Sequence, residues 1–161
     1  MIRIRLLWVG KAQERYVESG VEHFLRKLRP YARIECETLK PVKSGNLEQH
    51  RAQETGGLLA RLDPAERTVL LDERGECRSS ENLARWLEQE TVQGASRWTF
   101  VVGGAYGVEQ ERFPNTVQTL RLSDLTMNHQ LVRLVLLEQL YRAFTIQRGE
   151  PYHHAQATFR L

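Results

Sequence analysis

The chain has 161 residues, enough for one domain with its own core but not comfortably for two. Hydrophobic residues make up 41% of it and charged residues 27%, a balance that argues against wholesale disorder. The formal net charge is +3, and 19 of the 23 basic residues are arginine. This mild positive balance suits a nucleic-acid partner, and it suits equally well an organism that favours arginine.

Several classes of protein are disfavoured by what the sequence lacks. No apolar run approaches the ~20 residues that a membrane-spanning helix needs. The N-terminus alternates like a strand and has no small-residue cleavage site, so it does not read as a signal peptide. Cys36 and Cys77 stand far apart and outside any metal-binding spacing. We therefore expect a cytoplasmic protein with two reduced thiols and no bound metal.

Strands and helices alternate along the first half of the chain. The apolar spacing predicts a strand, a helix, a second strand and a second helix, at Ile2–Val9, Gln13–Arg29, Ala32–Leu39 and Leu47–Leu62. Pro30 ends the first helix. The second helix is weakly patterned and follows a loop with two lysines, and Gly56 and Gly57 interrupt it at a cost of about 1 kcal/mol each.

The same alternation continues in the second half. Thr68–Asp72 is predicted to be a short strand that ends at a turn formed by Glu73–Glu76, and Ser79 or Ser80 can cap the next helix. Two further strands and a long final helix are expected at Trp98–Val102, Thr116–Leu122 and His129–Ile146. This order predicts an α/β fold with a parallel or mostly parallel sheet and helices on both faces.

Ligands of such sheets bind at the carboxyl ends of the strands, and three segments of interest fall there. They are Leu71-Asp72, Gly103–Gly107 and Leu122–Met127. The glycine segment matches neither a P-loop nor a dinucleotide fingerprint, and alone it would more often be a simple turn. Residues 123–128 alone would more often be an ordinary helix cap. The convergence of three strand ends is the stronger indication of a site.

The final helix is apolar on almost every side. Its apolar residues are Leu131, Val132, Leu134, Val135, Leu136, Leu137, Leu140, Tyr141, Phe144 and Ile146. Such a helix needs a second cover besides its own sheet, and a second copy of the chain is the natural one. His129 and Arg133 share one face of it and need partners or a ligand, although a satisfied interface pair is a serious alternative. Residues 152–154 (YHH) suit a substrate lid or an RNA contact, or are merely a disordered tail.

The segments FVVGGAYGV, LRLSDLTMNHQLVRLVLLEQLYRAF and RGEPYHH together resemble the ribosomal RNA large-subunit methyltransferase H family of the SPOUT class. The resemblance runs from IRIRLLWVGK to YHH, so it covers practically the whole chain. It implies a single SPOUT domain over residues 1–161 with a C-terminal trefoil knot, and a homodimer with its active sites at the subunit interface. It also implies S-adenosylmethionine as methyl donor, and as acceptor N3 of a pseudouridine in 23S ribosomal RNA of the assembled ribosome.

By that resemblance, cofactor contacts fall on Leu71, Gly103, Leu122, Ser123, Asp124, Leu125, Thr126 and Met127. The candidates for base, anion stabiliser and substrate clamp are His129, Arg133, Tyr152 and His153. Asn128 stands where the family usually has proline, and residues 155–161 extend past its usual end. Two other classes of protein fit the sequence less well. A non-catalytic ribosome-binding factor would have no reason to keep the pocket segments, and a flavodoxin-like small-molecule enzyme would need a phosphate loop.

Overall fold

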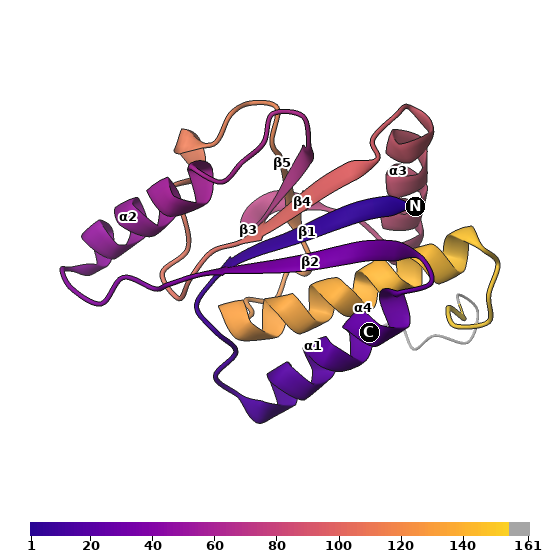
Figure 1. Cartoon of the computed structure of the whole chain (residues 1–161), viewed down its shortest axis with the longest axis horizontal. Coiled ribbons are helices and arrows are strands. Elements are labelled where there is room, and N and C mark those ends of the chain that lie inside the picture. Colours follow the sequence, from indigo (N-terminus) through magenta and orange to yellow (C-terminus); the bar gives the residue numbers. More distant parts are fainter. Residues whose placement is uncertain (155–161) are drawn as a thin grey trace.

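A five-stranded sheet forms the centre of the protein, whose computed structural model describes residues 1–154 (Figure 1). Every strand pairs in parallel with its neighbours, in the order β2-β1-β4-β3-β5. The strands are β1 (Ile2–Val9), β2 (Ala32–Leu39), β3 (Arg67–Cys77), β4 (Arg97–Val102) and β5 (Gln118–Arg121). The predicted α/β class with a parallel sheet is confirmed.

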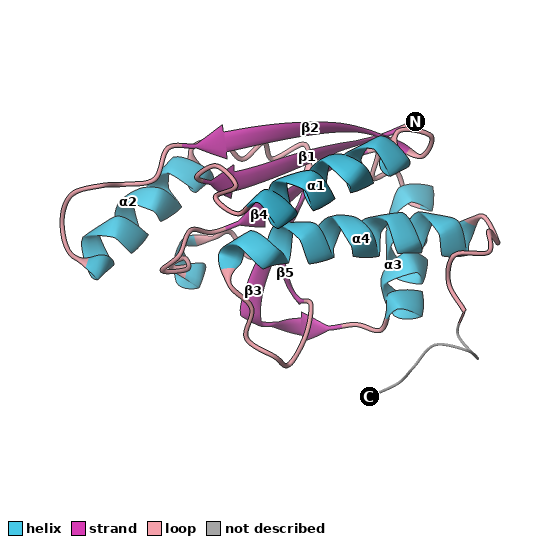
Figure 2. Cartoon of the chain, turned by 90° about the horizontal axis from the view of Figure 1, so that it is seen from below, coloured by secondary structure: helices cyan, strands magenta, loops and turns pink. Residues whose placement is uncertain are grey.

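Helices cover both faces of this sheet, but unequally. The helices are α1 (Arg15–Leu28), α2 (Leu47–Leu59), α3 (Ser80–Val92) and α4 (His129–Gln147), with a short 3₁₀ turn η1 (Gln110–Arg112). α1, α3 and α4 lie on one face, where α4 packs against both of the others. α1 and α4 run side by side in Figure 2. α2 lies on the opposite face, near the carboxyl ends of β1 and β2.

β1 illustrates how strand alternation divides the interior into two cores. Leu6 and Trp8 point into the larger core beneath α1, α3 and α4, whereas Leu7 and Val9 point into a smaller one beneath α2. All four side chains are at most 5% exposed. A strand buried on both faces loses its polar alternation, which is why the second half of β1, Leu6–Val9, reads as a continuous apolar run, whereas its first half alternates with Arg3 and Arg5.

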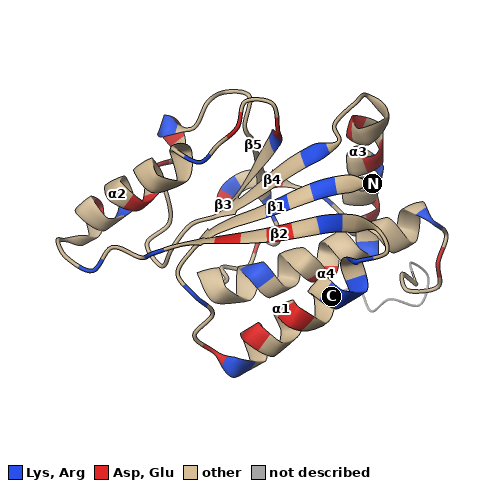
Figure 3. Cartoon of the chain, in the orientation of Figure 1, with Lys and Arg blue, Asp and Glu red and all other residues tan. Residues whose placement is uncertain are grey.

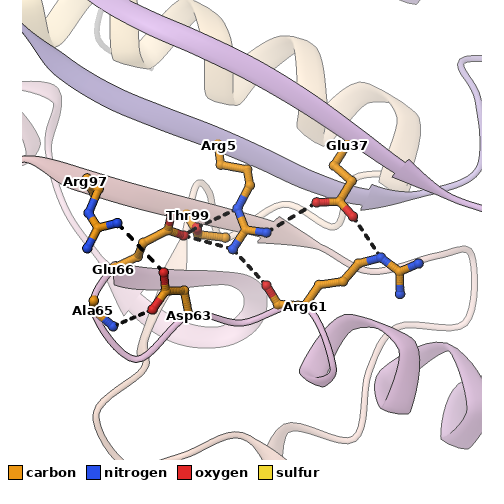
Figure 4. A network of polar contacts seen from close by, with 8 residues as sticks. All are labelled: Arg5, Glu37, Arg61, Asp63, Ala65, Glu66, Arg97 and Thr99. Carbon is orange, nitrogen blue, oxygen red and sulfur yellow. Dashed lines mark hydrogen bonds and ion pairs between the residues drawn. The ribbon is translucent and has the colours of Figure 1, made fainter.

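The part of the second face that α2 does not reach is closed by a polar network (Figure 4). Arg5 donates hydrogen bonds to Glu66 (2.8 Å), Glu37 (3.2 Å) and the hydroxyl of Thr99 (3.2 Å). Its guanidinium also donates to the carbonyl of Arg61 at 2.8 Å. The network therefore joins three neighbouring strands to the chain that follows α2, in place of a helix.

The prediction of a turn at Glu73–Glu76 is wrong, because β3 continues to Cys77. Leu71 and Glu76 both pair with Leu120 of β5, so the strand arches away after Leu71 and returns to the same partner. Figure 2 shows the resulting change of direction in β3. Gly75 permits the return, because a Cβ atom there would lie 2.7 Å from backbone atoms of Leu120.

The helix predicted at Leu47–Leu62 is confirmed as α2, which runs through Gly56 and Gly57 without a break and ends at Leu59. Hydrogen bonds at the N-terminus of α2 help to offset the low helix propensity of these two glycines. Asn46 accepts a hydrogen bond from the backbone N–H of Gln49, and the Gln49 side chain accepts one from the N–H of Asn46. This capping box satisfies two backbone donors of the first turn.

Part of the second cover expected for α4 comes from the chain itself. α4 packs closely on α1, where Leu134 lies against Gly20, and Leu136, Leu137 and Leu140 are fully buried. Leu131 and Val135 remain only half-buried, so a smaller apolar strip is left than the sequence suggests. Whether a second copy covers this strip stays a prediction.

Charged residues are spread over all layers of the fold (Figure 3). Lys and Arg occur on the strands and on helices of both faces, and Asp and Glu are interspersed with them. Within residues 1–154, no helix is long and apolar enough to cross a membrane.

Candidate functional site

A cavity of about 720 Å³ opens at the carboxyl ends of β4 and β5, beside the part of β3 that follows Leu71. The three segments singled out from the sequence meet in its wall, as parallel strand order requires. Among the predicted cofactor contacts, the wall contains Leu71, Gly103, Leu122, Ser123, Leu125, Thr126 and Met127. Asp124 belongs to the same loop but not to the wall. Their roles as cofactor contacts remain predictions.

The glycine segment after β4 brings backbone close to the cavity. Gly104 and Gly107 form an antiparallel bridge, and Gly107 has a φ of +73°, which favours glycine. A Cβ atom on Gly103 would lie 2.8 Å from Cγ1 of the buried Val108. One on Gly104 would lie 2.5 Å from a carboxylate oxygen of Glu54. Side chains at these two positions would therefore displace the loop or its supports.

The loop between β5 and α4 is held by its own polar side chains. Arg121 forms an ion pair with Asp124 at 2.7 Å, and the Ser123 hydroxyl accepts a hydrogen bond from the backbone N–H of Leu125. Asn128 accepts a hydrogen bond from the N–H of Leu131 and so caps α4. A proline could not make this cap, so the departure at Asn128 brings its own support for the loop. Leu125 is 78% exposed at the rim.

Asp72 and Arg74 form the polar side of the cavity. Arg74 donates to both carboxylate oxygens of Asp72, at 2.8 and 2.9 Å, and to the carbonyl of Val108 at 3.2 Å. Burial acts to raise the pKa of Asp72, but the side-chain and backbone hydrogen bonds of Arg74 outweigh it and hold the pKa below its usual value. The carboxylate is therefore ionised and already paired, which leaves the neighbouring wall mainly apolar.

His129, at the first turn of α4, is the one predicted catalytic residue in the described chain that lines the cavity. Its Nε2 lies 3.2 Å from Nε2 of Gln130. Burial, together with the positive charge of Arg133, lowers the pKa of His129. The ring is therefore neutral at physiological pH.

Arg133 is 1% exposed and lies outside the cavity wall. Its guanidinium donates hydrogen bonds to the carbonyls of Val9 (2.6 Å) and Gly10 (2.7 Å). Burial lowers the pKa of Arg133 to about 10, so it still carries its charge at neutral pH. In this geometry Arg133 fixes the end of β1 to α4, and a direct contact with a ligand would require these bonds to be exchanged.

Tyr152 and His153 follow the end of α4 that lies away from the cavity, and their side chains lie along the second half of the helix. The Tyr152 hydroxyl donates to Glu138 at 3.1 Å, and Nδ1 of His153 lies 3.1 Å from Arg142. Glu138 and Arg142 lie nine and thirteen residues after His129, which corresponds to about 14 and 20 Å along the helix axis. Within one chain, the structure therefore does not bring these two residues together with His129. Residues 155–161, the expected extension, lie outside the described residues.

Sequence reasoning missed two polar side chains near the cavity. Gln130, between the two candidates His129 and Arg133, is 5% exposed and contacts the loop after β1. Arg51 of α2 lines the cavity and donates to the carbonyl of Tyr106 at 3.0 Å. A buried glutamine on an apolar helix was a usable signal, because a buried amide needs partners. Nothing in the local sequence of α2 marks Arg51.

Comparison with known proteins defines the class first. A family model described as "Predicted SPOUT methyltransferase" matches residues 2–153, and this is the part of the chain that builds the sheet, the cavity and α4. The ribosomal RNA large subunit methyltransferase H of Geotalea daltonii is 43% identical over 153 residues, which cover 95% of this chain and 100% of that relative. The protein of the same name from Symbiobacterium thermophilum is 43% identical over 160 residues, covering 94% of this chain and 99% of the relative.

The chain is thus a SPOUT methyltransferase. Within that class, it belongs to the ribosomal RNA large subunit methyltransferase H family. Among solved structures it is similar to a probable methylase family protein from Haemophilus influenzae, with a TM-score of 0.48 and 11% identity over 91% of this chain and 66% of that one. It is also similar to a putative methylase family protein from Neisseria gonorrhoeae, with a TM-score of 0.47 and 12% identity over 99% and 88%.

Proposed function

We propose that this methyltransferase transfers the methyl group of S-adenosylmethionine to N3 of a pseudouridine in 23S ribosomal RNA of the assembled ribosome, in the cytoplasm. The observation that carries the proposal is the cavity at the carboxyl ends of β4 and β5, in a chain 43% identical to named ribosomal RNA large subunit methyltransferases. We further propose that the chain acts as a homodimer with the family's trefoil knot.

The cavity suits the proposed cofactor in size and in chemistry. Its volume of about 720 Å³ lies within the usual range for sites that enclose small molecules. Leu71, Val102 and Leu122 offer an apolar bed for adenine, and the loops after β4 and β5 offer backbone groups for its edge. Gly103 lets the loop after β4 pack directly on Val108, because a Cβ atom there would lie 2.8 Å from Cγ1 of that valine. Asp72 is already paired with Arg74, so recognition here depends on shape and backbone rather than on a free charge.

Methyl transfer asks little covalent chemistry of the chain itself. When bound, the sulfonium of the cofactor supplies an already activated methyl group, so the residues need only align donor and acceptor. N3 of the base must lose its proton, and negative charge then develops on its carbonyl oxygens. His129 is the described candidate placed to hydrogen-bond such a ligand from the cavity wall.

A second subunit would supply what one chain cannot. Tyr152 and His153 contact Glu138 and Arg142 in the middle and second half of α4, and neither lines the cavity of its own chain. Their role as substrate clamp therefore requires that the tail of one protomer reaches the cavity of its partner. The half-buried residues Leu131 and Val135, near the cavity end of α4, support an interface there.

Methyl-transfer assays on intact ribosomes and on free ribosomal RNA, followed by nucleoside mass spectrometry, test the reaction. We expect one N3-methylated pseudouridine on ribosomes and much less on free RNA. Methylation of free RNA alone would contradict the assembled ribosome as substrate. Absence of transfer to either, by a protein that binds the cofactor, would contradict the acceptor.

Mixing two inactive variants tests the shared site. Gly103→Trp blocks the cavity, and His153→Ala removes a tail residue. If each site combines the cavity of one protomer with the tail of the other, half of the randomly mixed dimers have one intact site, so activity recovers to about a quarter of the unmodified level. Two cavity variants, Gly103→Trp and Gly104→Trp, serve as the matched control and should not recover when mixed. No recovery in the first mixture would place each tail outside its partner's site.

A further inference from the structure

Gln130 is a buried amide that faces three different groups. Its Oε1 lies 3.2 Å from the backbone N of Gln13, its Nε2 lies 3.2 Å from the carbonyl of Lys11, and the same Nε2 lies 3.2 Å from Nε2 of His129. The side chain is 5% exposed, so water does not replace these partners. It thereby ties the first turn of α4 to the loop between β1 and α1.

The two backbone groups determine which way the amide points. The N–H of Gln13 can only donate, so it must face the amide oxygen, and the carbonyl of Lys11 can only accept, so it must face the amide nitrogen. The second N–H of that nitrogen is then directed at His129. Two donors do not attract each other, so Nε2 of His129 must present its lone pair.

We infer that Gln130 is a positioning residue that holds neutral His129 with its proton on Nδ1, so that the imidazole presents an N–H donor to the cavity. This inference rests on the proposed function, because it assigns a tautomer to the histidine in that active site. Among the described residues, Nδ1 of His129 has no hydrogen-bond partner, whereas Nε2 is occupied by Gln130. The ring is therefore arranged to donate a hydrogen bond to an oxygen of a ligand.

Two observations support this form of the ring. His129 lines the cavity, so a ligand there is within reach of the ring. Burial and Arg133 lower its pKa, which agrees with a neutral imidazole that accepts at Nε2. The ligand oxygen has two possible sources, the carboxylate of the methyl donor or a carbonyl of the acceptor base, and both are recognised by the same donor.

Long-range ¹H–¹⁵N NMR on the free full-length protein tests the tautomer without any catalysis. The His129 resonances are assigned by their loss in His129→Asn. We expect a protonated, pyrrole-type Nδ1 and an unprotonated, pyridine-type Nε2. A proton on Nε2 in the unmodified protein would overturn the inference, whatever the reaction proves to be.

Gln130→Met tests whether the amide causes this state, since methionine keeps the length of the side chain but cannot donate. We expect the His129 signals to move to those of a mixture of tautomers. Gln147→Met is the matched control, because Gln147 lies on the same helix and donates only to the carbonyl of Ala84. His129 signals that stay unchanged in Gln130→Met would show that Gln130 does not set the tautomer.

Calorimetry with S-adenosylmethionine and turnover on ribosomes then identify which oxygen is recognised. A weaker affinity for the methyl donor in Gln130→Met assigns the donor's carboxylate, and a lower kcat with unchanged affinity assigns the acceptor base. Each result supports the inference. Unchanged affinity and unchanged kcat, in a variant whose tautomer has been altered, would refute a positioning role. Failure of the unmodified protein to methylate ribosomes would count against the proposed function and leave the NMR result standing.

Discussion

The guanidinium of Arg133 lies over the indole ring of Trp8, with Cζ 4.8 Å from the ring centroid. This arrangement places a fully buried cation between an aromatic ring of β1 and the carbonyls of Val9 and Gly10 that end the same strand. The carbonyls at the end of β1 would otherwise be buried without donors at this point. Arg133 thus joins the strand end to α4, one helical turn beyond His129.

We expect Arg133→Met to lower the free energy of unfolding by about 2–4 kcal/mol, because two carbonyls lose their donor. Arg133→Lys should recover only part of this loss, since an ammonium group does not reproduce the planar fork or the stacking on Trp8. Urea unfolding followed by circular dichroism measures both. Arg85→Met, at an exposed position of α3, is the control and should change stability by less than about 0.5 kcal/mol. A loss no greater than that for Arg133→Met would contradict the assigned role.

Two helical glycines should respond in opposite directions to the same substitution. In Gly56→Ala of α2 the added methyl would lie 3.5 Å from the Arg112 side chain, an ordinary contact, so the gain in helix propensity should stabilise the fold by about 0.5–1 kcal/mol. Gly20→Ala in α1 would place a methyl 2.6 Å from Leu134, so it should destabilise by about 1–2 kcal/mol. Thermal and urea unfolding of both variants measure the difference. Equal effects would mean that α1 and α4 are not packed as closely as described.

Gly103→Ala should weaken binding of S-adenosylmethionine by about tenfold, or about 1.4 kcal/mol. The added methyl lies 2.8 Å from Val108 and must displace the loop after β4 or the valine beneath it. Isothermal titration calorimetry measures the affinity, with Gly56→Ala as a glycine control outside the cavity. Undiminished affinity in a folded Gly103→Ala variant would argue that the donor binds elsewhere.

Tyr31 should ionise well above the usual range for tyrosine. Burial, and then the hydrogen bond to the Glu150 carboxylate, raise the pKa of Tyr31 from 10.0 to about 12. Between these values the folded chain keeps a proton that the unfolded chain has lost, so this residue makes stability fall as pH rises through that window. Spectrophotometric titration of the folded protein should lose a step near pH 12 in Tyr31→Phe. A titration curve that Tyr31→Phe leaves unchanged near pH 12 would contradict the assignment.

The apolar periods predicted the order of elements because each strand buries both or one of its faces and each helix packs one stripe. They failed where a long-range contact decides the outcome. The arch of β3 depends on Gly75 approaching the backbone of Leu120, which lies 45 residues further along the chain. Such a contact is not visible in a local window of sequence.

The candidate site, too, could be predicted only in part from the sequence. The convergence of Leu71, Gly103 and Leu122 follows from parallel strand order alone, so sequence reasoning reached it. The pairing of His129 with Arg133 on one face was a sound geometric expectation, yet the structure directs them to different tasks. Arg133 donates hydrogen bonds to the carbonyls at the end of β1, whereas His129 lies in the cavity wall beside the Gln130 amide. Only the fold shows which buried partner each side chain finds.

The separation of Tyr152 from the cavity of its own chain has a consequence for handling the purified protein. If a working site needs the cavity of one molecule and Tyr152 of another, a monomer stays folded but lacks a complete active site. Specific activity should then fall on dilution, while circular dichroism stays constant, and it should return on reconcentration.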